Sequence, residues 1–191
     1  MNSIKKHAVN VILDPDTAHP SLILSADGKQ VKLGSRRQNL PDTPKRFTDY
    51  AIVLGREGFS SGKFYYEVQV KGQTLWDIGV AKESINRKGE IYLNPEYGYW
   101  TIYLRDGTYL AGADPPVTLF LKGKLQRVGV FVDYDTGLVS FYDADCWHNI
   151  YSFTNASFTE RIFPYFGPDD IYRGKNSAPL VIYPVHVCPT N

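Results

Sequence analysis

The chain has 191 residues, of which 43% are hydrophobic and 21% are charged, and its formal net charge is +1. This length is enough for one domain with a hydrophobic core. The near-zero charge excludes the strongly basic surface with which proteins bind nucleic acids or anionic membranes. No apolar run reaches the ~18–20 residues that span a bilayer, and the N-terminus lacks the apolar region of a signal peptide. We therefore expect a cytoplasmic protein that binds neither nucleic acid nor membrane.

The two cysteines, Cys146 and Cys188, lie far apart in the sequence and form no C-x-x-C pair. A disulfide between the two cysteines is one alternative. The missing secretory signal favours two free thiols in a reducing compartment.

Segments with the character of strands, separated by turn residues, follow one another along the chain. In residues 63–70 and 76–81 apolar and polar side chains alternate, which predicts strands with one buried face. Residues 38–47 contain two prolines and predict an irregular connection. The other strand-like segments are 22–33 and 127–143, each folded about a turn, and 161–166 and 178–184. Because no helical period persists for three turns, we expect an all-β fold, a sandwich of two antiparallel sheets.

Residues 97–112, YGYWTIYLRDGTYLAG, hold five aromatic side chains. Successive residues of a strand point to opposite faces of its sheet. The side chains expected to face the core are Trp100, Ile102 and Leu104. The outward side chains are Tyr99, Thr101, Tyr103 and Arg105, where a solvated strand would normally carry Lys, Glu or Ser.

The Asp-Gly pair at 106–107 is the preferred two-residue turn of a hairpin. This turn pairs Leu104 with Tyr109, and Tyr103 with Leu110. Tyr109 then faces the core, and Leu110 lies outward beside Tyr103.

An outward tyrosine beside a leucine and an arginine has the composition of an interface hot spot. Asp77 lies between two inward residues, so it also points outward, within possible reach of Arg105. Alternatively, Tyr103 covers the sheet or packs beneath a loop such as 113–118. If Tyr103 faces a partner, Tyr103→Ala weakens binding by about 1–3 kcal/mol and leaves stability nearly unchanged.

The sequence contains short matches to catalytic motifs, but the residues around them do not fit an active site. GFSSG (58–62) matches the G-x-S-x-G of serine hydrolases, but a strand follows it where the nucleophile elbow needs a helix. GFSSGK also lacks the spacing of a phosphate-binding loop. The four histidines are scattered, and the acidic clusters fall at expected turns. We expect no catalytic motif, no metal and no cofactor.

The order of the motifs resembles a known family. VILDPDTAHPSLILSADGKQVKLG and LPDTPKRF are similar to a PRY segment. The motifs similar to a SPRY domain are VLGREGFSSGKFYYEVQV, WDIGVAKESINRKG, GYWTIYLRDG, RVGVFVDYDTGLVSFYD, IFPYFGP and GKNSAPLVIYP. Together they cover about residues 9–185 and resemble the PRY-SPRY domains that end tripartite-motif (TRIM) E3 ubiquitin ligases, to which butyrophilins are related.

The resemblance implies a bent, concanavalin-like sandwich in which PRY strands complete the SPRY core. Residues 1–8 would be a linker or an expression tail, and residues 9–60 the PRY segment. Residues 61–188 would be the SPRY segment, and the two segments together would form one structural domain.

The resemblance also implies a function, the binding of a protein partner through loops and one face of the sandwich. We expect the substrate- or pathogen-recognising C-terminal domain of a TRIM-type ubiquitin ligase in innate immunity. Two cysteines cannot build the zinc-binding RING that transfers ubiquitin, so the chain itself is not expected to be an enzyme. The isolated domain would be a monomer, and its parent a dimer through a coiled coil. The alternatives are a butyrophilin-like sensor of a small phosphorylated ligand and RNA binding by exposed tyrosines.

The family's binding faces, carried over by position, fall on WDIGVAKE, WTIYLRDG and PYFGPDDIYRGKN. The last loop departs from the family's glycine-rich Asn/Asp-Gly-Gly-Lys-Asn, and Ile171 and Tyr172 there either anchor a partner or shield the edge of the core. Tyr99 is placed outward without an assigned contact. The residues predicted to contact a partner are Asp77, Tyr99, Tyr103, Arg105, Leu110, Asp170, Ile171 and Tyr172.

Overall fold

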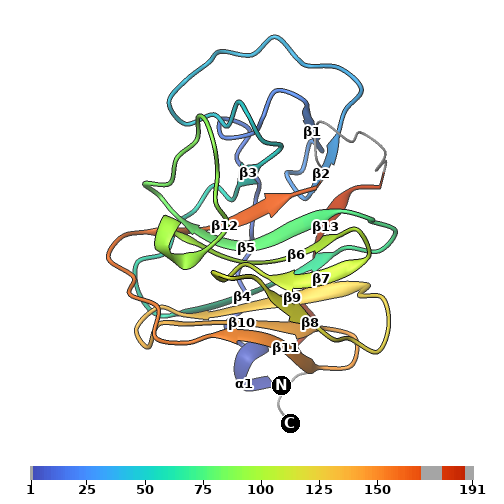
Figure 1. Cartoon of the computed structure of the whole chain (residues 1–191), viewed down its shortest axis with the longest axis vertical. Helices are drawn as coiled ribbons and strands as arrows, with labels where there is room; N and C mark the ends of the chain where they lie inside the picture. The colour runs from blue at the N-terminus through green and yellow to red at the C-terminus, as the bar shows by residue number, and fades with distance from the viewer. Residues whose placement is uncertain (1, 169–177, 188–191) are drawn as a thin grey trace.

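A computed structural model describes residues 2–168 and 178–187 of the chain, which form two packed antiparallel sheets (Figure 1). The seven-stranded sheet has the order β1 (Leu22–Leu24), β2 (Gln30–Leu33), β13 (Leu180–Tyr183), β4 (Lys63–Gln69), β9 (Arg127–Asp133), β10 (Leu138–Asp143) and β11 (His148–Phe153). The six-stranded sheet has the order β3 (Val53–Leu54), β12 (Ile162–Gly167), β5 (Trp76–Lys82), β6 (Tyr99–Arg105), β7 (Thr108–Ala111) and β8 (Val117–Leu119). The predicted all-β sandwich is confirmed.

Helical structure is confined to short elements in the part of the chain that is described. These are α1 (Asn2–Lys5) and the 3-10 helix η1 (Pro95–Tyr97). Neither is long and apolar enough to cross a membrane.

The alternation of side chains along the central strands builds the core between the sheets. Phe64 and Val68 of β4 face Ile78 and Val80 of β5 across one hydrophobic cluster, and all four are fully buried. The inward faces therefore follow the period of two that the sequence predicted.

The N-terminal third of the chain contributes strands to both sheets. The hairpin predicted over 22–33 forms as β1 and β2, and Val31 of β2 pairs with Leu180 of β13. β3 pairs with β12 in the other sheet. Residues 38–47 contain no strand, as expected.

Residues 7–9 are joined to β4 by main-chain hydrogen bonds, and the assignment of residues 1–8 to a linker or tail stays a prediction. The Tyr65 N–H donates to His7 O, and the Val9 N–H donates to Tyr65 O, both at 3.0 Å. This segment lies along β4 beyond the point where β13 ends. The N-terminus and α1 lie at the end of the molecule opposite β1 and β3 (Figure 1).

Cys146 is exposed and its thiol is free. Cys188 lies outside the described residues, so the state of its thiol stays a prediction.

Trp100 is a test of the core because only 2% of its surface is exposed and its ring packs edge-on against Phe158 at 4.8 Å. We expect Trp100→Ala to lower the free energy of unfolding by about 3–5 kcal/mol, since it leaves a large cavity. Urea denaturation followed by circular dichroism measures the change. Phe120→Ala is the control, because Phe120 is 92% exposed and its loss should cost less than about 0.5 kcal/mol. Equal stability of the two variants would show that Trp100 is not a core residue.

Candidate partner-binding site

The β6–β7 hairpin forms in the predicted register. Asp106 and Gly107 have φ values of 50° and 76°. Positive φ at both central residues is typical of the type I′ turn of a two-residue hairpin. Tyr103 lies directly opposite Leu110, and Leu104 opposite Tyr109. The local Asp-Gly signal was therefore sufficient to place these side chains.

A pocket of about 420 Å³ opens on the outer face of the six-stranded sheet, and we call it the Tyr103 pocket. Its floor comes from three adjacent strands, with Asp77 on β5, Tyr103 on β6 and Tyr165 on β12. Its walls come from three connections, around residues 50–52, 91–94 and 113–116. The floor is thus fixed by strand pairing, while the walls are loops.

Asp77 points outward as predicted, but only 6% of its surface is exposed. The Tyr165 hydroxyl, on the neighbouring strand, donates a hydrogen bond to Asp77 Oδ2. Burial, and then the negative charge of Asp77, raise the pKa of Tyr165 well above its ordinary value, so this hydroxyl remains a donor.

Gly167 of β12 lies opposite Asp77. A Cβ atom at this position would lie 2.5 Å from Asp77 Oδ1. The missing side chain therefore leaves the room that the carboxylate occupies.

Tyr103 and Arg105 form a stacked pair at the pocket. The guanidinium carbon of Arg105 lies 5.0 Å from the centre of the Tyr103 ring, in cation–π contact. Arg105 is exposed, whereas Tyr103 is 9% exposed and Leu110 beside it is half-buried. Burial raises the pKa of Tyr103, while the nearby charge of Arg105 opposes that rise.

The burial of Tyr103 corrects the expectation that Tyr103→Ala leaves stability nearly unchanged. Truncating a side chain that is nine-tenths buried removes packing contacts, so Tyr103→Ala must cost stability as well as any binding. Tyr103 both lines the pocket and packs within it.

Tyr99 also lies on the outer side of β6, but only 1% of its surface is exposed. Its ring packs edge-on against Tyr165 at 5.7 Å, and it belongs to a second apolar cluster with Phe47 and Ile52. Tyr99 therefore supports the floor of the pocket and does not reach its surface, which corrects its prediction as a contact residue.

The connection between β5 and β6 adds side chains at the pocket that we did not predict. Tyr92 and Tyr97 are 50% and 53% exposed, and their rings lie 5.1 Å apart at the side of the pocket. Asn94 Oδ1, in the pocket wall, is buried and has no hydrogen-bond partner among residues 2–168 and 178–187. The cluster of tyrosines before Trp100 was the available signal in the sequence.

Asp170, Ile171 and Tyr172 lie outside the described residues, so their contact with a partner stays a prediction. The strand that precedes them, β12, ends at Gly167 beside Asp77. The chain thus leaves the sheet at the floor of the Tyr103 pocket.

The arrangement is suited to binding. It combines buried acceptors, Asp77 and Asn94, with aromatic rings and one exposed guanidinium. No three metal-ligating side chains come together in the described ranges. The GFSSG motif is followed directly by β4, as expected, and not by the helix of a nucleophile elbow.

Comparison with known proteins places these features in a family. Residues 63–179 match the family model of the SPRY domain, and residues 11–59 match that of the SPRY-associated domain, PRY. Human pyrin is 48% identical over 94% of this chain and 23% of its own length. Human E3 ubiquitin-protein ligase TRIM68 is 45% identical over 94% of this chain and 37% of its own length. The chain therefore spans well under half the length of these curated relatives.

A solved structure shows the same fold. The crystal structure of the TRIM65 PSpry domain is similar with a TM-score of 0.78 at 19% identity, over 95% of this chain and 93% of that chain.

Tyr165→Phe tests the floor of the pocket. We expect it to lower the free energy of unfolding by about 1–3 kcal/mol at neutral pH, because the buried Asp77 carboxylate loses a donor. Above about pH 10 the unfolded state loses tyrosine protons that folded Tyr165 keeps, so wild-type stability should fall as the pH rises. This fall should be smaller in the variant, which has no hydroxyl at position 165.

Urea unfolding at neutral pH and at about pH 11 measures both effects. Tyr97→Phe is the matched control, since Tyr97 is 53% exposed. The assigned role of Tyr165 fails if the two variants behave alike at both pH values.

Proposed function

We propose that this chain, which belongs to the SPRY domain family and carries the associated PRY segment, recognises a protein partner through the Tyr103 pocket. SPRY domains are binding modules and not catalytic domains, and members of the TRIM family carry them. The observation that carries the proposal is the convergence of Asp77, Tyr103 and Arg105 on one hollow. These are the positions that the family's motifs assigned to partner binding.

The chemistry of the pocket favours a partner group that donates hydrogen bonds. Asp77 and Asn94 place acceptor oxygens in the pocket, and Tyr103 supplies apolar area. A buried acceptor that meets a donor from the partner gains specificity, because a partner without that donor leaves Asn94 Oδ1 unpaired.

We further infer that the chain is the recognition end of a cytoplasmic TRIM-type ubiquitin ligase of innate immunity, whose target is a substrate or pathogen protein. The 45% identity to TRIM68 supports this inference. Ubiquitin transfer would belong to a RING elsewhere in the parent protein, and a coiled coil there would pair two monomeric domains. The full-length reading frame tests the inference, which requires a RING and a coiled coil upstream. A reading frame without a RING would contradict it.

A small phosphorylated ligand is supported less well. An anion needs converging cations, whereas Arg105 in the Tyr103 pocket is accompanied by Asp77 and Asp114. Calorimetry with inorganic pyrophosphate distinguishes the two functions. Heat of binding that Arg105→Ala abolishes would favour the phosphorylated ligand.

Arg105→Glu tests the proposed interface directly. Arg105 is exposed, so we expect the variant to keep its melting temperature and to bind the partner about tenfold more weakly or worse. A partner captured from cells by the wild-type domain and then purified allows the affinities to be compared by calorimetry. Arg56→Glu is the control, because Arg56 is exposed and lies outside the Tyr103 pocket.

Tyr103→Ala should weaken the same interaction, with an additional loss of stability. If the captured partner binds the wild type, Arg105→Glu and a folded Tyr103→Ala with equal affinity, its interface lies elsewhere.

A further inference from the structure

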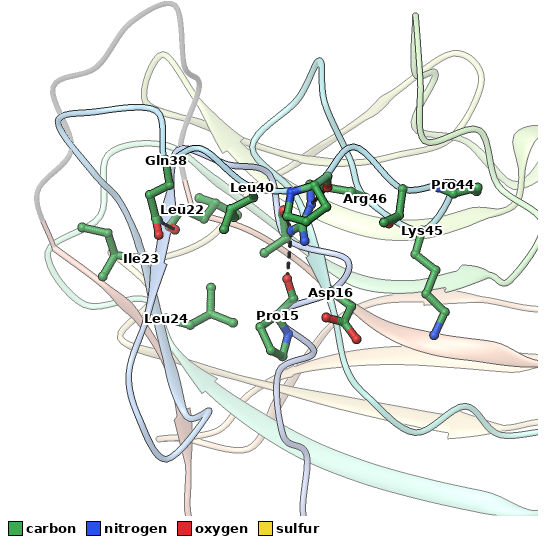
Figure 2. A pocket seen from close by; sticks show the side chains of 13 residues that line it. Pro15, Asp16, Leu22, Ile23, Leu24, Gln38, Leu40, Pro44, Lys45 and Arg46 are labelled. Atoms are coloured by element: carbon green, nitrogen blue, oxygen red, sulfur yellow. Dashed lines mark hydrogen bonds between the residues drawn. The ribbon is translucent and has the colours of Figure 1, made fainter.

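A second hollow, of about 840 Å³, lies on the PRY part of the sandwich and shares no residue with the Tyr103 pocket (Figure 2). β1 forms one side of it, and the irregular connection 38–46 forms the other. Figure 2 shows Leu22, Leu24, Leu40 and Pro15 around the open space. We call this hollow the PRY groove.

One side of the PRY groove is the free edge of a sheet. Among the described residues, β1 is the terminal strand of the seven-stranded sheet and pairs with β2 only. Main-chain hydrogen bonds at Ser21 and Ser25 tie β1 to β2. Because such bonds alternate along an antiparallel pair, the main-chain N–H and C=O of Leu22 and Leu24 point away from β2.

The two outward-facing residues of this edge differ in their partners. The Leu22 N–H donates to His19 O at 3.0 Å, and the Leu22 carbonyl accepts from Gln38 Nε2 at 2.8 Å. The outward N–H and C=O of Leu24 have no hydrogen-bond partner within the described ranges. The main-chain groups of Leu22 are therefore already hydrogen-bonded, whereas those of Leu24, at the groove, are available to another strand.

The charge inside the PRY groove is positive. Arg46 is 5% exposed, and none of the ion pairs found among the described residues involves it. In the part of the chain that the structure describes, its guanidinium donates only to the main-chain carbonyls of Pro15, Ala18 and Pro41, at 2.7–2.9 Å. A buried cation held by neutral acceptors attracts an anion that can approach it.

The rim adds a second positive charge. Lys45 lines the groove and is exposed, and Asp16 is the acidic residue that lines it. Asp42, close by, is engaged by Lys88. The cations of the lining thus outnumber its carboxylates, which complements an acidic ligand.

We propose that the PRY groove binds an extended, acidic segment of a partner protein, which adds a strand to the free edge of β1. The main chain of this segment would pair with Leu24, as strands do in β-augmentation. Alternate side chains of the segment would enter between Leu24 and Leu40, and a carboxylate next to them would meet Lys45 and Arg46. This surface is independent of the Tyr103 pocket, so a partner can engage either or both.

Selection from a random linear peptide library displayed on phage tests the proposal. The library is selected on the immobilised wild-type domain and depleted on Leu40→Asp, which places a charge of the wrong sign in the groove. Leu40 is 37% exposed, so this variant should fold, and Leu40→Ser replaces it if circular dichroism shows that it does not. We expect the surviving peptides to carry Asp or Glu next to Leu, Ile, Val or Phe.

The affinity of a synthetic peptide of the selected sequence then shows whether it binds at the PRY groove or elsewhere. We expect its affinity to fall about tenfold or more in Leu40→Asp and in Lys45→Glu. Phe120→Asp and Lys122→Glu are the matched controls, since both residues are exposed and line neither hollow, and they should bind normally. Tyr103→Ala should also bind the peptide normally. Hydrogen exchange by nuclear magnetic resonance should show slower exchange of the Leu24 amide when the peptide is bound.

Three results would overturn the proposal. One is a selection in which no peptide survives depletion on the folded groove variant. Another is a peptide that retains its affinity in Lys45→Glu or leaves the exchange of the Leu24 amide unchanged. The third is a wild-type dimer in sedimentation that Leu40→Asp dissociates, because the groove would then bind a second copy of the chain.

Discussion

The buried carboxylate of Asp77 constrains the whole outer face of the six-stranded sheet. A charge that is removed from water must be hydrogen-bonded, and Tyr165 from the next strand is one donor to it. The two meet only in the observed register of β5 and β12, and Tyr99 packs edge-on against Tyr165 in turn. With these three side chains fixed, Tyr103 lies beside Asp77 on β6, where the loops close around it.

Local patterns in the sequence were sufficient for most strands and for the hairpin register, because the period of two and the Asp-Gly turn act between near neighbours. They did not reveal β3, β8 and β11. These patterns predicted correctly that Asp77 and Tyr99 lie on the outer face of the sheet. They did not predict that both side chains are buried there. The side chains that cover them, among them Phe47, Ile52 and Tyr165, come from distant parts of the chain. Strand periodicity carries no information about what packs above a face. The PRY groove was not predictable for the same reason, since one wall is a connection without regular structure.

The two hollows are held open in different ways. The floor of the Tyr103 pocket rests on three paired strands, so its shape depends on the ladder of main-chain hydrogen bonds. The PRY groove depends on side chains of the connection 38–46, because Arg46 ties it to Pro15 and Ala18, and Gln38 ties it to Leu22. The walls of the PRY groove are therefore joined by side-chain hydrogen bonds, and the floor of the pocket by main-chain hydrogen bonds.

Gly167 limits which positions of the Tyr103 pocket can be substituted. Any side chain there enters the space of the Asp77 carboxylate, so the floor resists change by single substitutions. The connections around it carry no such constraint, and loops tolerate substitution better than paired strands. New partner preferences are therefore accessible by mutation of the walls, over an inherited floor that stays the same.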